Sequence, residues 1–300
     1  MIEATRIIVI SLLIAITFGG FFGWVRIARF WWSQSRKVDE PNRKLDLLLP
    51  PISRHRPSWT VADFLLAMGL GILLPVFLLS FVSQTPDPEA ALEPSVQPQP
   101  KLSLEQLAVQ LFSYTLIVSS LIGWISLTSG NAIKRIGLTF NKTNLLIGLK
   151  STPIILLAVM LLNLIATTIV KYEHPVLNEL SQQQSVAFWL MSFLVTGIAT
   201  PIYEEFVFRG LLQGSLQALA DKTPNDSTWR PDSIWPVIAA SFIFAMLHFP
   251  GQGAAPIPIF GLSVGLGYLY RQTGSLWPPI LVHMILNSLT LMEHLTKTPV

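Results

Sequence analysis

The sequence predicts an all-α polytopic membrane protein with about eight transmembrane helices. Of its 300 residues, 51% are hydrophobic and only 12% are charged, and the mean hydropathy is +0.54. A chain of this composition is too apolar for a water-soluble globule. Apolar runs long enough to cross a bilayer recur along it, and basic residues gather between them, as they do in loops on the inner side of a membrane.

Composition also excludes several kinds of site. The chain has no cysteine, which rules out disulfides, thiolate nucleophiles, cysteine-ligated zinc and iron–sulfur clusters. Its net charge of +3 does not indicate a nucleic-acid partner, because the basic residues lie between apolar segments and report orientation in the membrane. Neither standard glycine-rich phosphate loop is present.

The N-terminal region, residues 1–143, is predicted to hold three spans, at 7–25, 61–82 and 107–127. The first span is predicted to stay uncleaved, because the residues before it are not strongly basic and no small-residue cleavage site follows it. It therefore counts as a membrane span and not as a signal peptide.

Two loops of this region indicate its orientation. Residues 26–57 carry eight Lys and Arg against three acidic residues, which predicts a cytoplasmic loop and an outside N-terminus. Residues 83–105 hold five prolines and are predicted to form an extended outside loop. The tryptophans that flank the basic loop are predicted to anchor it at the membrane interface, namely Trp31, Trp32 and Trp59.

The C-terminal region, residues 144–293, is predicted to hold the other five spans, at 145–170, 186–219, 234–249, 257–270 and 278–292. Span 186–219 is predicted to kink at Pro201, because proline lacks the N–H of one helical hydrogen bond. Gly261, Gly265 and Gly267 give the next-to-last span a small-residue face suited to close helix packing.

Two adjacent carboxylates, Glu204 and Glu205, interrupt the span that contains Pro201. A charge near the centre of a bilayer costs about 2.5–3.5 kcal/mol on insertion scales, so the pair needs a use or a partner. Arg209 follows Glu205 by one helical turn and is its predicted ion-pair partner. Glu204 projects about 100° away from Glu205 and has no such partner. Glu204 is therefore predicted to be the acid that does chemistry.

Two histidines, His248 and His283, also lie within predicted spans. Asn287 follows His283 by one turn on the same helix face, and Phe244 precedes His248 by one turn. Taken singly, either histidine or Asn287 is explained by a hydrogen bond between helices. Glu204 alone is explained as an interior acid that is neutralised by a proton or by Arg209. Phe244 alone is explained by packing. Together these residues supply a base, a proton donor and oxyanion donors.

This set of residues could split an amide with water. Glu204 would take a proton from a water that His248 also holds, and the water would attack a peptide carbonyl. His283 and Asn287 would donate hydrogen bonds to the oxygen that becomes negative. Glu205, Arg209 and Phe244 are predicted to support these groups.

A divalent metal offers an alternative mechanism. Zinc or another divalent ion would be held by Glu204, His248 and His283. The sequence contains no His-Glu-x-x-His, the usual motif for zinc. Two non-hydrolytic functions are the further alternatives: a non-catalytic immunity or scaffold module, and a proton-coupled transporter that uses Glu204 as its relay. The chain shows no paired halves of the kind many transporters have.

The predicted spans place Glu204, His248 and His283 at different depths in the membrane, although the proposed mechanism requires them to meet. Counted from the predicted span limits, Glu204 and His283 fall in the inner half of the membrane, whereas His248 lies 14 residues, about 21 Å, from the start of its span at Ile234. We expect a tilted sixth helix, or one whose inner end lies below the hydrocarbon.

Three motifs in order resemble those of the CPBP intramembrane proteases, which include the CAAX prenyl endopeptidases and the bacteriocin self-immunity proteins. The motifs are Glu204-Glu205-x-x-x-Arg209, Phe244-x-x-x-His248 and His283-x-x-x-Asn287. The resemblance covers about residues 145–292. It implies a catalytic centre of Glu204, His248, His283 and Asn287; members are commonly labelled metal-dependent, although a metal-free glutamate mechanism is also argued for them.

The resemblance implies an intramembrane endopeptidase that acts on a peptide or membrane-protein substrate in the lipid bilayer. The short loops and the lack of targeting signals favour a bacterial plasma membrane, with a thylakoid or plastid membrane as the alternative. The sequence does not indicate the substrate or the oligomeric state.

Overall fold

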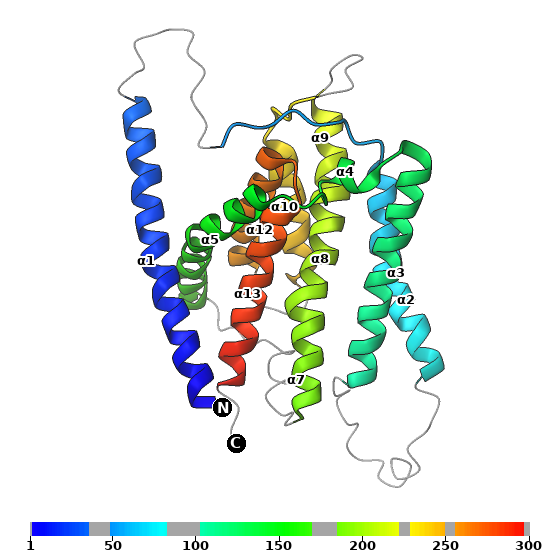
Figure 1. Cartoon of the computed structure of the whole chain (residues 1–300), viewed down its shortest axis with the longest axis horizontal. Helices are drawn as coiled ribbons and strands as arrows, with labels where there is room; N and C mark the ends of the chain where they lie inside the picture. The colour runs from blue at the N-terminus through cyan, green and yellow to red at the C-terminus, as the bar shows by residue number, and fades with distance from the viewer. Residues whose placement is uncertain are drawn as a thin grey trace.

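The computed structural model describes residues 2–35, 49–82, 103–169, 185–221, 229–249 and 256–296. They form a bundle of helices (Figure 1), which confirms the predicted all-α membrane fold. Apart from one isolated bridge between Arg54 and Trp229, the described residues contain no β-structure. The helices are α1 (Ile2–Ser35), α2 (Val61–Val82), α3 (Leu104–Ser129), α4 (Ala132–Ile136), α5 (Lys142–Ile169), α7 (Val186–Ser192), η1 (Phe193–Ala199), α8 (Thr200–Glu205), η2 (Phe206–Gln213), α9 (Gly214–Ala220), α10 (Trp235–Leu247), α12 (Pro256–Thr273) and α13 (Trp277–Leu295).

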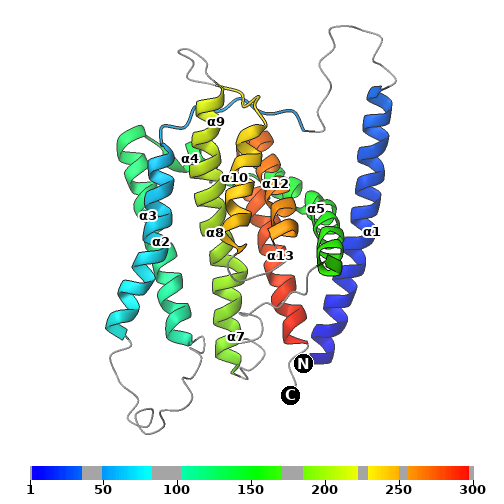
Figure 2. The ribbon, with the colours of Figure 1, turned by 180° about the vertical axis from the view of Figure 1, so that it is seen from behind.

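Every predicted span coincides with helix. Five helical stretches of the described residues are long and apolar enough to cross a membrane: 3–34, 61–82, 104–129, 142–169 and 186–220. In contrast, α10 has 13 residues and is about 20 Å long, which is shorter than a hydrocarbon core of about 30 Å. Seen from behind (Figure 2), α10 runs part-way into the bundle and α12 returns toward the end from which α10 came.

The two ends of the bundle separate the predicted inside segments from the predicted outside ones. Residues 49–60, α4 and the start of α10 lie at one end, which we call the capped end. The starts of α3 and α7 lie at the other, which we call the α7 end. Segments predicted to be cytoplasmic thus share one end. Most of the predicted outside loop 83–105 lies outside the described residues.

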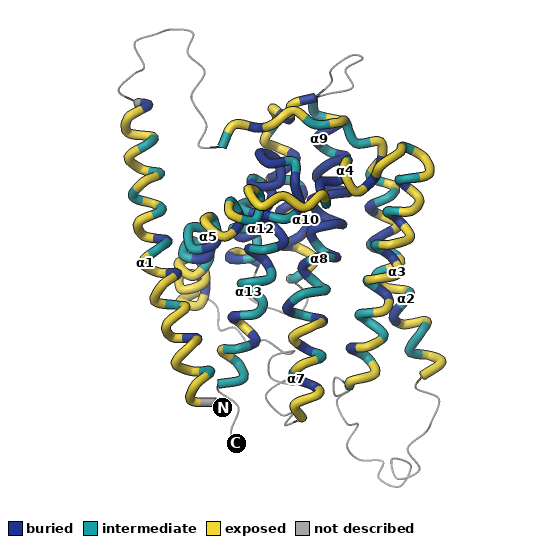
Figure 3. The backbone as a smooth tube through the Cα atoms, viewed as in Figure 1, coloured by how far each residue is buried: buried dark blue, intermediate teal, exposed yellow. Residues whose placement is uncertain are grey.

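The main hydrophobic core lies between the capped end and the middle of the bundle, as the burial colouring of Figure 3 shows. Every residue of η2 is buried, and this segment packs against Trp59, Ile136 and Leu276. Trp59 does not anchor an interface as predicted, because its side chain is only 5% exposed and its Nε1–H donates to the carbonyl of Gly210 at 2.8 Å. The exposed tryptophans Trp31 and Trp32 keep that prediction open.

Residues 49–60 cross the capped end as an extended segment, which we call the strap. The Arg54 and Trp229 backbones exchange two hydrogen bonds, and the Arg54 guanidinium lies 4.7 Å from the centre of the Tyr270 ring. Arg56 donates to the carbonyl of Ala218 at 2.5 Å. The strap is therefore fastened to the segments that follow α9 and to the last turns of α9 and α12.

The predicted fifth span is one continuous helical stretch from Val186 to Ala220. Pro201 lies in the first turn of α8, directly after the π-helical segment η1. A π-helical turn is a known way to fit an irregularity into a helix. The structure thus places a π-helical segment where the sequence predicted a kink.

Candidate active site

The two adjacent glutamates lie in different surroundings. Glu205 is fully buried, and its Oε2 lies 3.1 Å from Nε of Arg209, the partner predicted one turn away. The side chain of Glu204 is 17% exposed and makes no contact with an arginine among the ion pairs of the described residues. A buried carboxylate needs a counter-charge, whereas a partly exposed one can meet water or substrate.

His283 contacts both glutamates. Its Nδ1 lies 2.9 Å from Oε1 of Glu205, and its Nε2 lies 3.6 Å from Oε2 of Glu204. An ionised carboxylate only accepts hydrogen bonds, so Nδ1 is the donor to Glu205. This bond fixes the ring with Nε2 toward Glu204, as a carboxylate orients a functional histidine in many sites.

His248 completes the group from the end of α10. Its Nδ1 lies 2.7 Å from the carbonyl oxygen of Phe244, which can only accept, so Nδ1 carries the proton. Its Nε2 lies 4.0 Å from Oε1 of Glu204, and its side chain is 26% exposed. Glu204 therefore stands between the Nε2 atoms of two histidines that come from different helices.

The predicted conflict of depth is not present in the structure. His248 follows the 13 residues of α10 and lies about 20 Å from its start at the capped end. Glu204 lies 16 residues, about 24 Å, before the end of α9 at Ala220 on the same side. The two side chains meet because α10 stops part-way through the bundle, and span limits had assigned it a full crossing.

Phe244 packs beneath the two histidines. Its ring centre lies 4.5 Å from that of His248 and 6.2 Å from that of His283. The guanidinium of Arg209, the ion-pair partner of Glu205, lies 5.1 Å from the centre of the Phe244 ring and makes a cation–π contact with it. Phe244 is buried, so it holds the histidines and Arg209 at fixed spacing.

Asn287 contacts the backbone of the glutamate helix. Its Nδ2 donates to the carbonyl oxygen of Thr196 at 2.9 Å. In η1 the N–H of Thr200 bonds to the carbonyl five residues back, at Val195. The next bond in this register would join Pro201 to Thr196, and Pro201 has no N–H. The Asn287 amide replaces that donor and keeps one further N–H for another partner.

The sequence analysis missed a set of polar side chains beside Glu204. The ring of Tyr114, on α3, stacks on Tyr203 with centres 4.1 Å apart and planes 11° apart. The Tyr114 side chain lies near those of Gln110 and Thr200, and Thr200 lies one turn before Glu204. The signal was available: Gln106, Gln110 and Tyr114 recur at four-residue spacing and therefore share one helix face.

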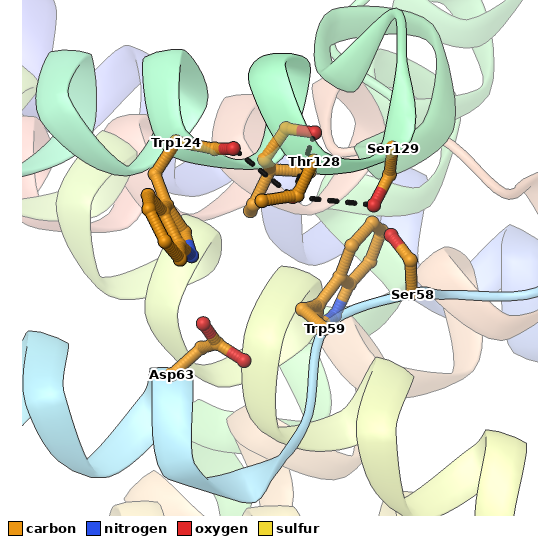
Figure 4. A pocket seen from close by; sticks show the side chains of 7 residues that line it. Ser58, Trp59, Asp63, Trp124, Thr128 and Ser129 are labelled. Carbon is orange, nitrogen blue, oxygen red and sulfur yellow. Dashed lines mark hydrogen bonds between the residues drawn. The ribbon is translucent and has the colours of Figure 1, made fainter.

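A polar pocket of about 310 Å³ lies at the capped end, away from these residues (Figure 4). Its carboxylate, Asp63, accepts hydrogen bonds from the N–H and the hydroxyl of Thr60. This is the arrangement that starts a helix, here α2. The pocket is lined by Ser58, Trp59, Asp63, Trp124, Ile125, Thr128 and Ser129, and none of the predicted site residues is among them.

The three side chains considered as zinc ligands, Glu204, His248 and His283, do lie together. Within the described residues, however, no group of three His, Asp or Glu side chains has the geometry to hold a metal ion.

A comparison with protein-family models gives a match to part of the chain. Residues 186–289 match the family model described as type II CAAX prenyl endopeptidase Rce1-like. No curated protein and no solved structure matches the chain. The match contains every residue of the three motifs, whereas Gln110 and Tyr114 lie outside it.

Proposed function

Because residues 186–289 belong to the type II CAAX prenyl endopeptidase Rce1-like family, an intramembrane protease family, we propose that this integral membrane protein hydrolyses a peptide bond with a water that Glu204 activates. One observation carries the mechanism: the partly exposed Glu204 carboxylate lies 4.0 and 3.6 Å from the Nε2 atoms of His248 and His283.

The first step is attack by water. Nδ1 of His248 donates to the Phe244 carbonyl, so Nε2, which faces Glu204, is the nitrogen proposed to accept a hydrogen bond from the water. A water between His248 and Glu204 would donate to both and direct its oxygen at the substrate carbonyl carbon. As that bond forms, Glu204 takes the proton, and the carbonyl oxygen becomes negative.

The second step is stabilisation of this oxyanion. With a proton on Nε2, His283 donates to the oxygen, while Glu205 balances the imidazolium from the other side. The second N–H of Asn287 is the other proposed donor. The carbon–nitrogen bond then breaks, and Glu204 returns its proton to the leaving amine.

The substrate class that we propose is a peptide or membrane-protein segment that reaches the site within the bilayer. The family description names CAAX prenyl endopeptidases; our proposal for this chain covers peptide-bond hydrolysis and leaves the prenyl group aside. A divalent ion on Glu204, His248 and His283 is the alternative means of activating water.

The test compares membrane-protein fragments in cells that carry wild-type protein, Glu204→Gln or Glu3→Gln. Glu3 is an exposed carboxylate in the first turn of α1 and serves as the matched control. We expect a set of fragments to disappear in Glu204→Gln and to remain in Glu3→Gln at equal protein abundance. Identical fragments in all three would contradict the proposal and favour a binding module that keeps the pocket without catalysis.

A further inference from the structure

The helical stretch Val186–Ala220, called the long helix below, is fully buried, or sealed, just C-terminal to Glu204 and partly exposed on the N-terminal side of it. Toward the capped end, all residues of η2, Phe206–Gln213, are buried. Toward the α7 end, Thr196 and Thr200 share the face of Glu204 at four-residue spacing, and all three are partly exposed. Figure 3 shows the same change along this helix. The partly exposed Glu204 carboxylate is therefore reached from the α7 side.

The strap adds a second barrier at the capped end. Trp59 donates a hydrogen bond to the Gly210 carbonyl. Arg54 donates to the Tyr270 carbonyl near the end of α12 and pairs with Trp229. A Cβ added to Gly214 would meet the Trp59 indole nitrogen at 3.1 Å, which shows how closely the strap is packed there. Close packing of this kind leaves little room for water between Trp59 and Gly214.

Helix α3 presents polar side chains toward the unsealed part of the long helix. Gln110 and Tyr114 are partly buried. The Tyr114 ring stacks on Tyr203 of the neighbouring helix, and its side chain lies near Gln110 of its own helix and Thr200 of the other. Phe112 and Leu116, between and beyond them, are 58% and 42% exposed, as expected for side chains that face lipid. Thr115 instead returns its hydroxyl to its own helix, at the carbonyl of Leu111.

A partly exposed amide is costly against hydrocarbon, because an unpaired polar group loses its hydrogen bonds to water. The amide of Gln110 is therefore more stable where it meets water or other polar groups. Together with Tyr114 and Thr200, it forms a continuous polar line that ends one turn from Glu204.

We propose that water, and the polar part of a substrate, reach Glu204 from the α7 end along a path lined by Gln110, Tyr114 and Thr200. The use of this path rests on the function proposed above, whereas its existence does not. Two of the three residues come from α3, outside the part of the chain that matches the family. The N-terminal region thereby contributes to the site.

The chain has no cysteine, so single introduced thiols can test the path directly. The positions are Gln110 on the path, Phe112 on the lipid face of the same helix, and Val207 in the sealed segment. Ser185, exposed at the start of α7, reports which side of the membrane the α7 end faces. A charged, membrane-impermeant methanethiosulfonate reagent is applied to each side of sealed vesicles.

A thiol in hydrocarbon forms almost no reactive thiolate, so we expect Gln110→Cys to label on the order of tenfold faster than Phe112→Cys. The fast labelling should occur from the side that labels Ser185→Cys, and Val207→Cys should stay unlabelled from either side. Equal rates at positions 110 and 112, or labelling of Gln110→Cys or Val207→Cys from the capped side, would overturn the path.

Labelling does not require catalysis. Gln110→Cys should label at the same rate with Glu204→Gln in the same chain, and bulky modification at position 110 should stop the fragments that depend on Glu204. If no fragments depend on Glu204 but the labelling pattern holds, the proposed function fails and the path stands. If fragments depend on Glu204 but position 110 labels no faster than position 112, the function stands and the path fails.

Discussion

Glu205 accepts a hydrogen bond from Nδ1 of His283 at 2.9 Å, so the glutamate that appeared structural in the sequence also orients a proposed catalytic histidine. Its other oxygen lies 3.1 Å from Nε of Arg209. One carboxylate thus joins the ion pair predicted from helical spacing to a second helix. Changes at Glu205 should therefore affect both stability and activity.

Glu205→Gln should lower activity without abolishing it. An amide can still contact His283 but no longer balances an imidazolium, and loss of such a supporting carboxylate typically costs about 10–100-fold. The measurement is the rate at which a Glu204-dependent fragment accumulates, normalised to protein abundance. An unchanged rate would show that His283 does not need this carboxylate.

Arg209→Ala should destabilise the protein by about 3–5 kcal/mol, because it leaves the fully buried Glu205 without its counter-charge. Thermal unfolding of the purified protein in detergent measures this. The matched control is Arg209→Ala combined with Glu205→Gln, which removes the unpaired charge and should recover part of the loss. Glu204→Gln should unfold close to wild type; equal losses in Glu204→Gln and Arg209→Ala would contradict the assignment of separate roles.

Asn287→Ala should lower turnover by about 10²–10³, as loss of an oxyanion donor does, with little change in substrate binding. It should also destabilise by about 1–3 kcal/mol, because the Thr196 carbonyl loses its donor. Pro201→Ala returns a backbone N–H at that point. Added to Asn287→Ala, it should restore stability but not turnover; recovery of both would show that Asn287 acts only through the backbone.

The metal-free and metal-dependent mechanisms make opposite predictions for the purified protein. The proposed mechanism expects no stoichiometric divalent ion by elemental analysis and unchanged cleavage after treatment with a chelator. A stoichiometric ion that disappears in His283→Ala, together with the activity, would refute it and make the histidines ligands.

The junction between α9 and α10 should show a dependence on acid. Partial burial of Asp221 raises its pKa, but hydrogen bonds from Ser233, Gln217 and Asp232 outweigh that and hold the pKa below its ordinary value of 3.8. Its contribution to stability is therefore present above the ordinary pKa and lost as pH falls through the lowered one.

The measurement is the difference in thermal midpoint between wild type and Asp221→Ala in detergent. This difference should be full at about pH 6 and shrink toward about pH 2. Asp63→Ala is a suitable comparison, since Asp63 also holds a helix end through hydrogen bonds from Thr60. A difference for Asp221→Ala that stays constant over this range would contradict the proposed linkage.

Helical spacing made much of the site predictable. Residues four apart on one helix share a face, so the contact between Glu205 and Arg209 followed from the sequence alone. The predicted spans also proved helical. A helix satisfies all backbone hydrogen bonds within one segment, so an apolar run long enough to cross a membrane is expected to be helical.

Contacts between helices were less accessible to sequence reasoning. Nothing local indicates that His283 would reach Glu205 or that Asn287 would bond to Thr196, because these pairs lie 78 and 91 residues apart. Hydropathy also gave α10 a full crossing, since an apolar helix that stops within the bundle has the same composition as the start of one that crosses. Tyr114 was missed because a tyrosine in an apolar span is also consistent with packing.

The strap has a consequence for how this protein can be divided. Residues 49–60 precede most of the helices they fasten, and Trp59 supplies the indole that meets the Gly210 carbonyl. A shortened chain that began at residue 144 would keep every motif residue but lose that donor, together with the ring of Tyr114 on Tyr203. Trimming to the motif-bearing part would therefore uncover the Gly210 carbonyl and the Tyr203 ring, and co-expression of the missing part would be needed to cover them again.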